Sequence, residues 1–415
     1  MRFPLVDLFA GCGGLSLGLE RAGFTSVYVN ELHNDALETY LANRTDFEVD
    51  LADPRRHSND IRKITNKRQS VLDLANYLNA QHGELGLVVG GPPCQGFSGI
   101  GHRRTFSDLA KEDIPTNHLY EDMAIMVDEL QPRAFIFENV RGLLSARWNA
   151  SGEKGEIWAD IVRTFSSVGE RRGKKQYRIG WSLVYAKDYG VPQNRPRVVL
   201  VGIREDILFR SVSDVASGLI PNPIGGAPDL VDLLGDLIDP EWGEVSETIR
   251  YPHGVQNKVQ EDLRRGRDGT VSRKGSFLTE MEYSKHSADV TAKFSYMLTN
   301  NGKIPKHFQT KKFAQRLMPA RWAESGPSIT ATSLPDDYVH FSQPRILTVR
   351  EWARLQTFPD WYKFSGKRTT GGRRRAGDPS VGDWTREVPK YTQIGNAVPV
   401  LLAKALGEHI REIID

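Results

Sequence analysis

A short loop-like stretch carries Cys94, one of two cysteines in the 415 residues. In GGPPCQGFS this cysteine lies between two prolines and a glycine, outside any apolar periodic run. The thiolate is the nucleophilic form of cysteine, and nearby cations lower its pKa; His102, Arg103 and Arg104 follow within a few residues. Alone, the loop leaves two interpretations: a reactive thiol on a shaped mount, or a small buried side chain.

Two other stretches place charged side chains beside apolar runs. FIFENVRGLL carries Glu138 at the end of one run, where a buried carboxyl can hold a proton. PQNRPRVVLVGI carries Arg195 and Arg197, which share a face if the chain is extended. The alternatives are that Glu138 caps a helix and that Arg195 and Arg197 lie on an exposed edge. Together with Cys94, the three side chains would supply a nucleophile, a proton carrier and a fixed cation.

The first apolar run leads into a glycine-rich turn, DLFAGCGG, with glycines at 11, 13 and 14. Such a turn lets the backbone approach a ligand closely, and in an open α/β sheet it lies at the carboxyl edge. Glu31 follows about 20 residues later, where an acidic residue reaches ribose hydroxyls, and Asp60 could accept from an exocyclic amine. The spacing differs from G-x-G-x-x-G, so we expect a nucleoside-containing cofactor rather than a dinucleotide. The alternative is that the glycines only make turns and that Glu31 is a surface residue.

The elements that must position these residues alternate in the first half of the chain. Residues at 32, 36 and 40 and at 123, 127 and 130 recur at helical spacing. This alternation predicts an α/β fold with a doubly wound, mostly parallel sheet. After about residue 205 the rhythm stops, and a final helix begins near Asn396 and Pro399 with a stripe at 402, 406, 410 and 413. The expected strands are 3–9, 26–31, 85–91, 133–139, 182–190 and 197–203.

Charge and hydropathy indicate which classes of protein fit this sequence. Lys and Arg total 55 against 52 Asp and Glu, so the net charge of +3 alone does not indicate nucleic acid. Basic residues are nevertheless clustered, as in KFSGKRTTGGRRR over 363–375. No apolar run approaches the roughly 18 residues of a membrane span, and no signal peptide is evident. We therefore expect a cytoplasmic protein with free thiols and no metal site.

Five motifs in order resemble the C5-cytosine DNA methyltransferase family. They are DLFAGCGG, GGPPCQGFS, ENV, QNRPRV and YTQIGNAVP, with PRILTVREWARLQTFPDWY before the last. The resemblance implies a Rossmann-like S-adenosylmethionine-dependent methyltransferase sheet and covalent catalysis. Cys94 would add to C6 of a flipped cytosine, Glu138 would bond or protonate N3, and Arg197, with Arg195 nearby, would hold O2.

The resemblance also implies the binding residues. The cofactor would be held by Phe9, Gly11, Gly13, Glu31, Asp60, Ile61, Pro92, Asn396 and Val398. Double-stranded DNA would be bound with the target base flipped out, and basic side chains would displace counterions along the phosphates. The expected DNA contacts are Gln95, Ser98, Arg103, Arg104, Lys311, Lys312, Arg373 and Arg374, with Lys303 and Lys306 in the same basic region.

The same resemblance implies how the chain is divided into domains. Residues 1–205, completed by 388–415, would form the catalytic and cofactor-binding domain. Residues 206–343 would form a smaller, irregular target-recognition domain, and 344–387 a hinge with a basic insert. We expect a monomeric bacterial or phage modification enzyme, acting beside a separate restriction endonuclease in the cytoplasm or nucleoid. The alternatives are an RNA cytosine-5 methyltransferase, an inactive DNA-binding protein on the same scaffold, and a nicotinamide-dependent dehydrogenase.

Overall fold

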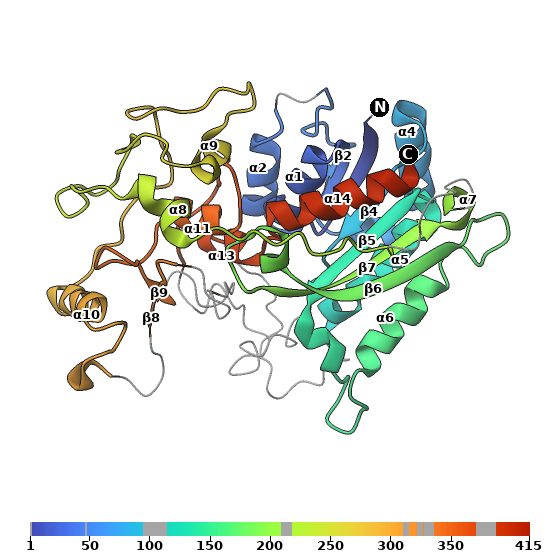
Figure 1. The fold of residues 1–415 in the computed structure, drawn as a ribbon. Coiled ribbons are helices and arrows are strands. Elements are labelled where there is room, and N and C mark those ends of the chain that lie inside the picture. The colour runs from blue at the N-terminus through green and yellow to red at the C-terminus, as the bar shows by residue number, and fades with distance from the viewer. Residues whose placement is uncertain are drawn as a thin grey trace.

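A seven-stranded sheet forms the centre of the larger lobe (Figure 1). The computed structural model describes residues 2–45, 48–93, 114–208, 218–309, 315–321, 327, 336–370 and 387–415. The strand order is β3-β2-β1-β4-β5-β7-β6; the first five strands are parallel, while β7 runs antiparallel to both β5 and β6. The strands are β1 (Phe3–Leu8), β2 (Phe24–Asn30), β3 (His57–Ser58), β4 (Leu87–Gly90), β5 (Ala134–Val140), β6 (Tyr177–Tyr185) and β7 (Pro196–Arg204).

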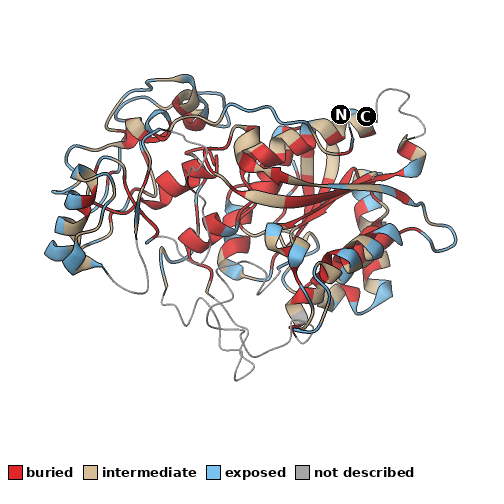
Figure 2. Cartoon of the chain, turned by 60° about the horizontal axis from the view of Figure 1, so that its bottom comes forward, coloured by how far each residue is buried: buried red, intermediate tan, exposed pale blue. Residues whose placement is uncertain are grey.

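Both faces of the sheet are covered, because alternate side chains of each strand enter different cores. In β5, Phe135 and Phe137 pack on one face, whereas Ala134 and Ile136 pack on the other. The first face is covered by α4 (Arg68–His82), α5 (Leu119–Leu130) and α6 (Glu156–Ser166), the second by α1 (Gly14–Arg21) and α14 (Val400–Ile414). Burial is concentrated along the strands and the inner sides of these helices (Figure 2).

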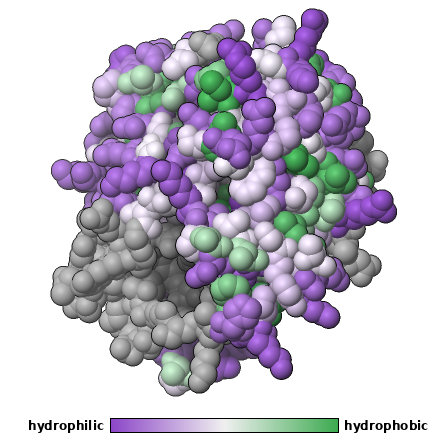
Figure 3. All heavy atoms as spheres, turned by 90° about the vertical axis from the view of Figure 1, so that its left-hand side faces the viewer, coloured by the Kyte–Doolittle hydropathy of each residue, from purple (hydrophilic) through white to green (hydrophobic). Residues whose placement is uncertain are grey.

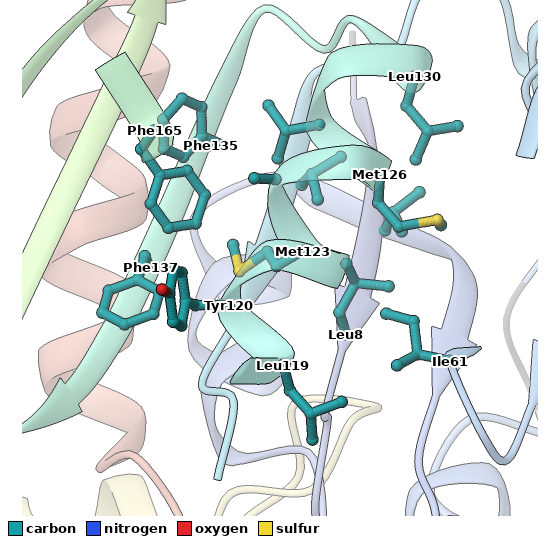
Figure 4. Close-up of a cluster of buried hydrophobic side chains, with 14 of the residues drawn as sticks. Leu8, Ile61, Leu119, Tyr120, Met123, Met126, Leu130, Phe135, Phe137 and Phe165 are labelled. Carbon is teal, nitrogen blue, oxygen red and sulfur yellow. The ribbon is translucent and has the colours of Figure 1, made fainter. Parts of the chain in front are cut away.

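Helix α5 supports the strand that carries Glu138. Its apolar side chains point toward the sheet and pack in one cluster with Phe135 and Phe137 of β5 (Figure 4). Phe135 stacks on Phe165 of α6 with ring centroids 5.2 Å apart. Such close packing fixes the position of the strand end. The α5 side chains in this cluster are Leu119, Tyr120, Met123, Ala124, Met126, Val127 and Leu130.

The smaller lobe is built from short elements and long connections (Figure 1). One hydrophobic cluster contains residues of both lobes. Cys12 and Leu17 of the larger lobe belong to it, and so do Trp352 and Tyr362. The surface on this side of the molecule is mainly hydrophilic, with small separate hydrophobic patches (Figure 3). The longer elements are α8 (Leu230–Leu234), α9 (Lys258–Arg264), α10 (Ala288–Thr299) and α11 (Val349–Leu355), with the short strands β8 (Arg316–Leu317) and β9 (Tyr338–Val339).

The remaining helices are connectors. Helix α2 (Asn34–Ala42) follows β2, and α13 (Lys390–Asn396) precedes α14. The others are α3 (Arg62–Thr65) and α7 (Glu205–Leu208), with 3₁₀ turns η3 (Pro115–His118), η4 (Arg141–Ser145), η5 (Ala186–Tyr189), η7 (Gly235–Leu237) and η8 (Lys306–Phe308). In the part of the chain that the structure describes, no helix is both long and apolar enough to cross a lipid bilayer.

The α/β fold and the mostly parallel sheet are confirmed. Leu32 does not belong to the expected helical stripe, because it precedes α2 and is 54% exposed. Strand β6 begins at Tyr177 and ends at Tyr185, so 186–189 is a 3₁₀ turn rather than strand. At the C-terminus, Pro399 is the N-cap of α14, whereas Asn396 ends α13.

Candidate active site

The residues just before Cys94 in the sequence lie beside Glu138. Cys94 itself is outside the described residues, but Gly91 and Pro92, just before it, are described. Gly91 packs on the carboxylate: a Cβ built there would lie 3.0 Å from Glu138 Oε2. Asn139 Nδ2 donates to the Pro92 carbonyl oxygen at 2.9 Å. These two contacts hold the start of the cysteine loop against the end of β5.

Glu138 pairs with Arg197 across two antiparallel strands. Glu138 lies opposite Val199 and Arg197 opposite Val140, so the two side chains are diagonal neighbours on one face. Arg197 Nε is 2.5 Å from Glu138 Oε1, with the side chains 11% and 9% exposed. Burial lowers the pKa of Arg197, and the Glu138 carboxylate opposes that shift. The pair places a carboxylate and a guanidinium together at the carboxyl edge of the sheet.

Arg195 is buried and donates hydrogen bonds to backbone carbonyl oxygens. Its Nη2 donates to the carbonyl oxygen of Gly395 at 2.7 Å. Burial and the nearby Arg197 lower its pKa well below the ordinary value. In the same motif, Gln193 donates to Gln356 Oε1 at 2.7 Å. The segment 193–197 thus joins the sheet edge to the chain around α11 and α13.

The glycine-rich turn after β1 is braced by Glu31. Phe9, Gly11 and Gly13 have φ angles of 56°, 56° and 83°, in the left-handed region that favours glycine. Glu31 Oε2 accepts from the Gly11 amide, and Oε1 accepts from the His33 amide, both at 2.8 Å. Among the residues that the structure describes, no atom lies within 4 Å of a Cβ built at Gly11, so they leave this side of the turn open. An open turn beside a buried carboxylate fits a nucleoside ligand with ribose hydroxyls.

The other expected cofactor residues lie on both sides of this turn. Val398 approaches from the C-terminal segment so closely that a Cβ on Gly14 would lie 2.4 Å from its carbonyl oxygen. Ile61 is buried after β3, and Asp60 Oδ1 accepts from the Arg62 amide at 3.1 Å. Asn396 is exposed at the end of α13, and Phe9 is half-buried at the turn. Their roles toward a cofactor stay predictions.

The family follows from comparison with known proteins. The sequence model of C-5 cytosine-specific DNA methylase matches residues 3–412. The chain belongs to the C-5 cytosine-specific DNA methylase family. The chain is 32% identical to "Type II methyltransferase M.DdeI" of Desulfomicrobium norvegicum over 417 residues, covering 98% of this chain and 88% of the relative. It is 29% identical to "Type II methyltransferase M1.HphI" of Haemophilus parahaemolyticus, covering 99% and 87%.

Solved structures agree with this methylase fold. A crystal structure named as a prophage-encoded DNA modification methyltransferase of E. coli aligns with a TM-score of 0.65 at 22% identity, covering 99% of both chains. The methyltransferase EhMeth of Entamoeba histolytica aligns with a TM-score of 0.54 at 13% identity, over 99% and 98%. The family and its relatives favour DNA methylation over the RNA, inactive-scaffold and dehydrogenase alternatives.

Several expected methylase residues lie outside the described residues. Besides Cys94, these are the DNA-contact candidates Gln95, Ser98, Arg103, Arg104, Lys311, Lys312, Arg373 and Arg374. Of the basic residues near them, Lys303 and Lys306 are described and exposed. Cys12, the second cysteine, is free and buried, and burial raises the pKa of its thiol to about 12. The Cys12 thiol is therefore buried and neutral, so Cys94 remains the candidate nucleophile.

A buried polar network behind the methylase turn was missed by sequence reasoning. Arg44 and Tyr362 contact the peptide groups of Cys12 and Gly13, and Asp7 lies in the same core with its pKa raised to about 7, chiefly by burial. Asp7 belongs to the DLFAGCGG motif and could have been noticed as a charge inside an apolar run. Arg44 and Tyr362 carry no such signal, because they are 318 residues apart in the sequence.

Proposed function

We propose that this DNA cytosine-5 methyltransferase transfers a methyl group from S-adenosylmethionine to C5 of a cytosine flipped out of a specific duplex sequence. The observation that carries the proposal is the buried Glu138–Arg197 pair beside the mount of Cys94. C5 of cytosine is a weak nucleophile, so the ring must first lose its conjugation. A thiol, a carboxyl and a guanidinium around one base would accomplish this.

Each side chain has a defined part in the proposed reaction. The Cys94 thiolate forms a bond to C6, which breaks the C5–C6 double bond and moves charge onto N3 and O2. Glu138 holds or protonates N3, and Arg197 offsets the charge at O2. C5 would then bond to the methyl group that the cofactor supplies, which leaves S-adenosylhomocysteine. Solvent water would take the C5 proton and Glu138 would take back any proton on N3, while the C6–sulfur bond breaks and the C5–C6 double bond forms again, which restores the ring and the thiolate. Arg195 would lie near Arg197 at O2, and its hydrogen bonds hold the backbone of residues 395–396.

The bound cofactor would supply an electrophilic methyl group. The open turn at Gly11 fits its methionine portion without a phosphate cradle, and the second lone pairs of the Glu31 carboxylate can accept from ribose hydroxyls. Gly13, like Gly11, would lie beneath the methionine portion. Phe9, Asp60 and Ile61 would hold the adenine, with Pro92, Asn396 and Val398 as neighbours. Residues 206–343 would select the DNA sequence, and a restriction endonuclease with the same recognition sequence would be the partner in the cell.

Sequencing of bisulfite-treated DNA from cells that express the protein tests the proposed reaction. We expect 5-methylcytosine at one short sequence motif and at no other cytosines. DNA from cells that express the Cys94→Ser variant at the same level should carry none. Absence of 5-methylcytosine with folded wild-type protein present would refute the proposal.

A further inference from the structure

Two carbonyl groups of the glycine-rich turn point away from the open side and into a buried polar cluster. The Cys12 carbonyl oxygen accepts from the Tyr362 hydroxyl at 2.5 Å. The Gly13 carbonyl oxygen accepts from Ser16 Oγ at 3.3 Å and from Arg44 Nη2 at 3.4 Å. A Cβ on Gly13 would lie 2.9 Å from both Arg44 Nη1 and the Tyr362 hydroxyl. The back of the turn is thus in direct contact with Arg44 and Tyr362.

Arg44 is held in one orientation by its hydrogen bonds. Its side chain is 1% exposed, and its Nε donates to Glu20 Oε1 at 2.7 Å. Nη1 donates to the Tyr40 carbonyl oxygen and to the Tyr362 hydroxyl, while Nη2 donates to Ser16 Oγ and the Gly13 carbonyl oxygen. A planar guanidinium with all five donors engaged cannot rotate without breaking several bonds. Arg44 is therefore a rigid support for the turn.

Tyr362 reaches the turn from a segment 350 residues away in the sequence. It follows α11 in the cluster that joins the two lobes, and its carbonyl oxygen accepts from Arg350 Nη2 at 2.8 Å. Asp360, two residues earlier, accepts from Arg354 and from the Tyr251 hydroxyl of the smaller lobe. The position of the Tyr362 hydroxyl thus depends on contacts made by both lobes.

We propose that Arg44 and Tyr362 are positioning residues for the cofactor: they hold the Cys12 and Gly13 peptide groups from behind, so that the open face of the turn keeps the shape that binds S-adenosylmethionine. The inference rests on the proposed cofactor. Neither side chain touches the ligand in this arrangement. Their loss acts through the turn, so cofactor affinity falls more than overall stability or DNA binding does.

Removal of one hydroxyl tests the proposal. Tyr362→Phe deletes the donor to Cys12 and keeps the ring. Tyr391→Phe is the matched control, since the Tyr391 hydroxyl is also buried and donates to a backbone oxygen, that of Leu347 at 2.9 Å. We expect calorimetric titration with S-adenosylhomocysteine to show about fivefold to tenfold weaker binding for Tyr362→Phe, the worth of one hydrogen bond. Tyr391→Phe should bind within about twofold of wild type.

A second pair of variants covers the case in which Tyr362→Phe does not fold. Ser16→Ala removes a donor to the Gly13 carbonyl oxygen, whereas Ser26→Ala removes a hydroxyl from the same network that donates to Glu20 and does not contact the turn. Ser16→Ala should weaken S-adenosylhomocysteine binding about threefold, and Ser26→Ala should not. Affinity for duplex DNA should stay at the wild-type value in all four variants.

The outcomes separate this inference from the proposed function. Wild-type protein that binds no S-adenosylhomocysteine would refute the proposed cofactor and the inference with it. If wild-type protein binds S-adenosylhomocysteine and folded Tyr362→Phe binds it equally well, the inference is overturned and the proposed function is not. If Tyr362→Phe does not fold, the same conclusion follows from unchanged affinity in Ser16→Ala. Equal losses in the variants and their controls, or a parallel loss of DNA affinity, would assign these side chains to general stability and also overturn it.

Discussion

Arg197 and Glu138 face each other diagonally across β7 and β5, with Arg197 Nε 2.5 Å from Glu138 Oε1. The pair is nearly buried, and Glu138 lies against Gly91, three residues before Cys94 in the sequence. A charged pair in this position is costly unless each partner compensates the other. The arrangement therefore suggests that the two groups are retained for chemistry at the sheet edge.

Glu138→Gln should abolish most methyl transfer. The amide keeps the shape of the side chain but can neither carry a proton nor hold a full negative charge, so kcat should fall about 100-fold or more. Affinity for S-adenosylhomocysteine should stay within about twofold of wild type. Glu129→Gln is the control, because Glu129 is also buried among cations, including Arg68 and Lys174, but lies on α5 rather than on a strand of the sheet. A Glu138→Gln variant with wild-type kcat would contradict the assigned role.

Arg197→Met should destabilise the fold, because it leaves Glu138 buried beside an apolar side chain. We expect a loss of about 3 kcal/mol in the free energy of unfolding, measured by urea denaturation. The double variant with Glu138→Gln should lose less than the sum of the two single changes, which measures the coupling between the partners. Additive losses would mean that the pair has no energetic coupling.

Glu31→Gln should weaken cofactor binding. The neutral amide retains one acceptor oxygen, so it cannot brace both the Gly11 and the His33 amides and also accept from a ribose. We expect about tenfold weaker binding of S-adenosylhomocysteine by calorimetry. Glu38→Gln, at an exposed position on α2, should bind as wild type does. Unchanged affinity in Glu31→Gln would exclude Glu31 from the cofactor site.

Asp7→Asn should change how stability depends on pH. Burial raises the pKa of Asp7 from 3.8 to about 7, so the folded protein keeps a proton that the unfolded chain releases near pH 4. Stability from this group is thus greatest at low pH and is lost as pH rises from about 4 to about 7, at up to roughly 1.4 kcal/mol per pH unit. The uncharged asparagine removes that loss.

Urea denaturation at several pH values checks this expectation. The unfolding free energy of Asp7→Asn minus that of wild type should increase from about pH 5 to about pH 7 and then level off. Asp73→Asn is the control, since Asp73 is exposed on α4. A difference between Asp7→Asn and wild type that stays constant over this range would show that Asp7 ionises normally in the folded protein.

The sheet and the meeting of Glu138 and Arg197 at one edge could be predicted because their signals are local. Near-continuous apolar runs marked β1, β4, β5 and β7, and the charged residues at their ends fell at one edge. The antiparallel direction of β7 has no local signal, although it is what sets Arg197 diagonal to Glu138.

Contacts between distant segments could not be predicted. Asp236 accepts from both Arg264 and Arg354, all fully buried, although each looks like an ordinary surface charge in sequence. The Arg44–Tyr362 contact joins residues 318 positions apart. Long-range polar pairs leave no periodic pattern in the sequence, so the arrangement of the smaller lobe and the contacts behind the glycine-rich turn are evident only in the folded structure.

The most direct test of the account is covalent capture of the enzyme on DNA that contains 5-fluorocytosine, in the presence of S-adenosylmethionine. Fluorine cannot leave C5 as a proton does, so the bond from sulfur to C6 should persist in a denaturing gel. Wild type and Cys12→Ser should both form the adduct, because Cys12 is buried with a neutral thiol, and Cys94→Ser should form none. An adduct in Cys94→Ser, or none in a wild-type enzyme that methylates ordinary DNA, would contradict the account.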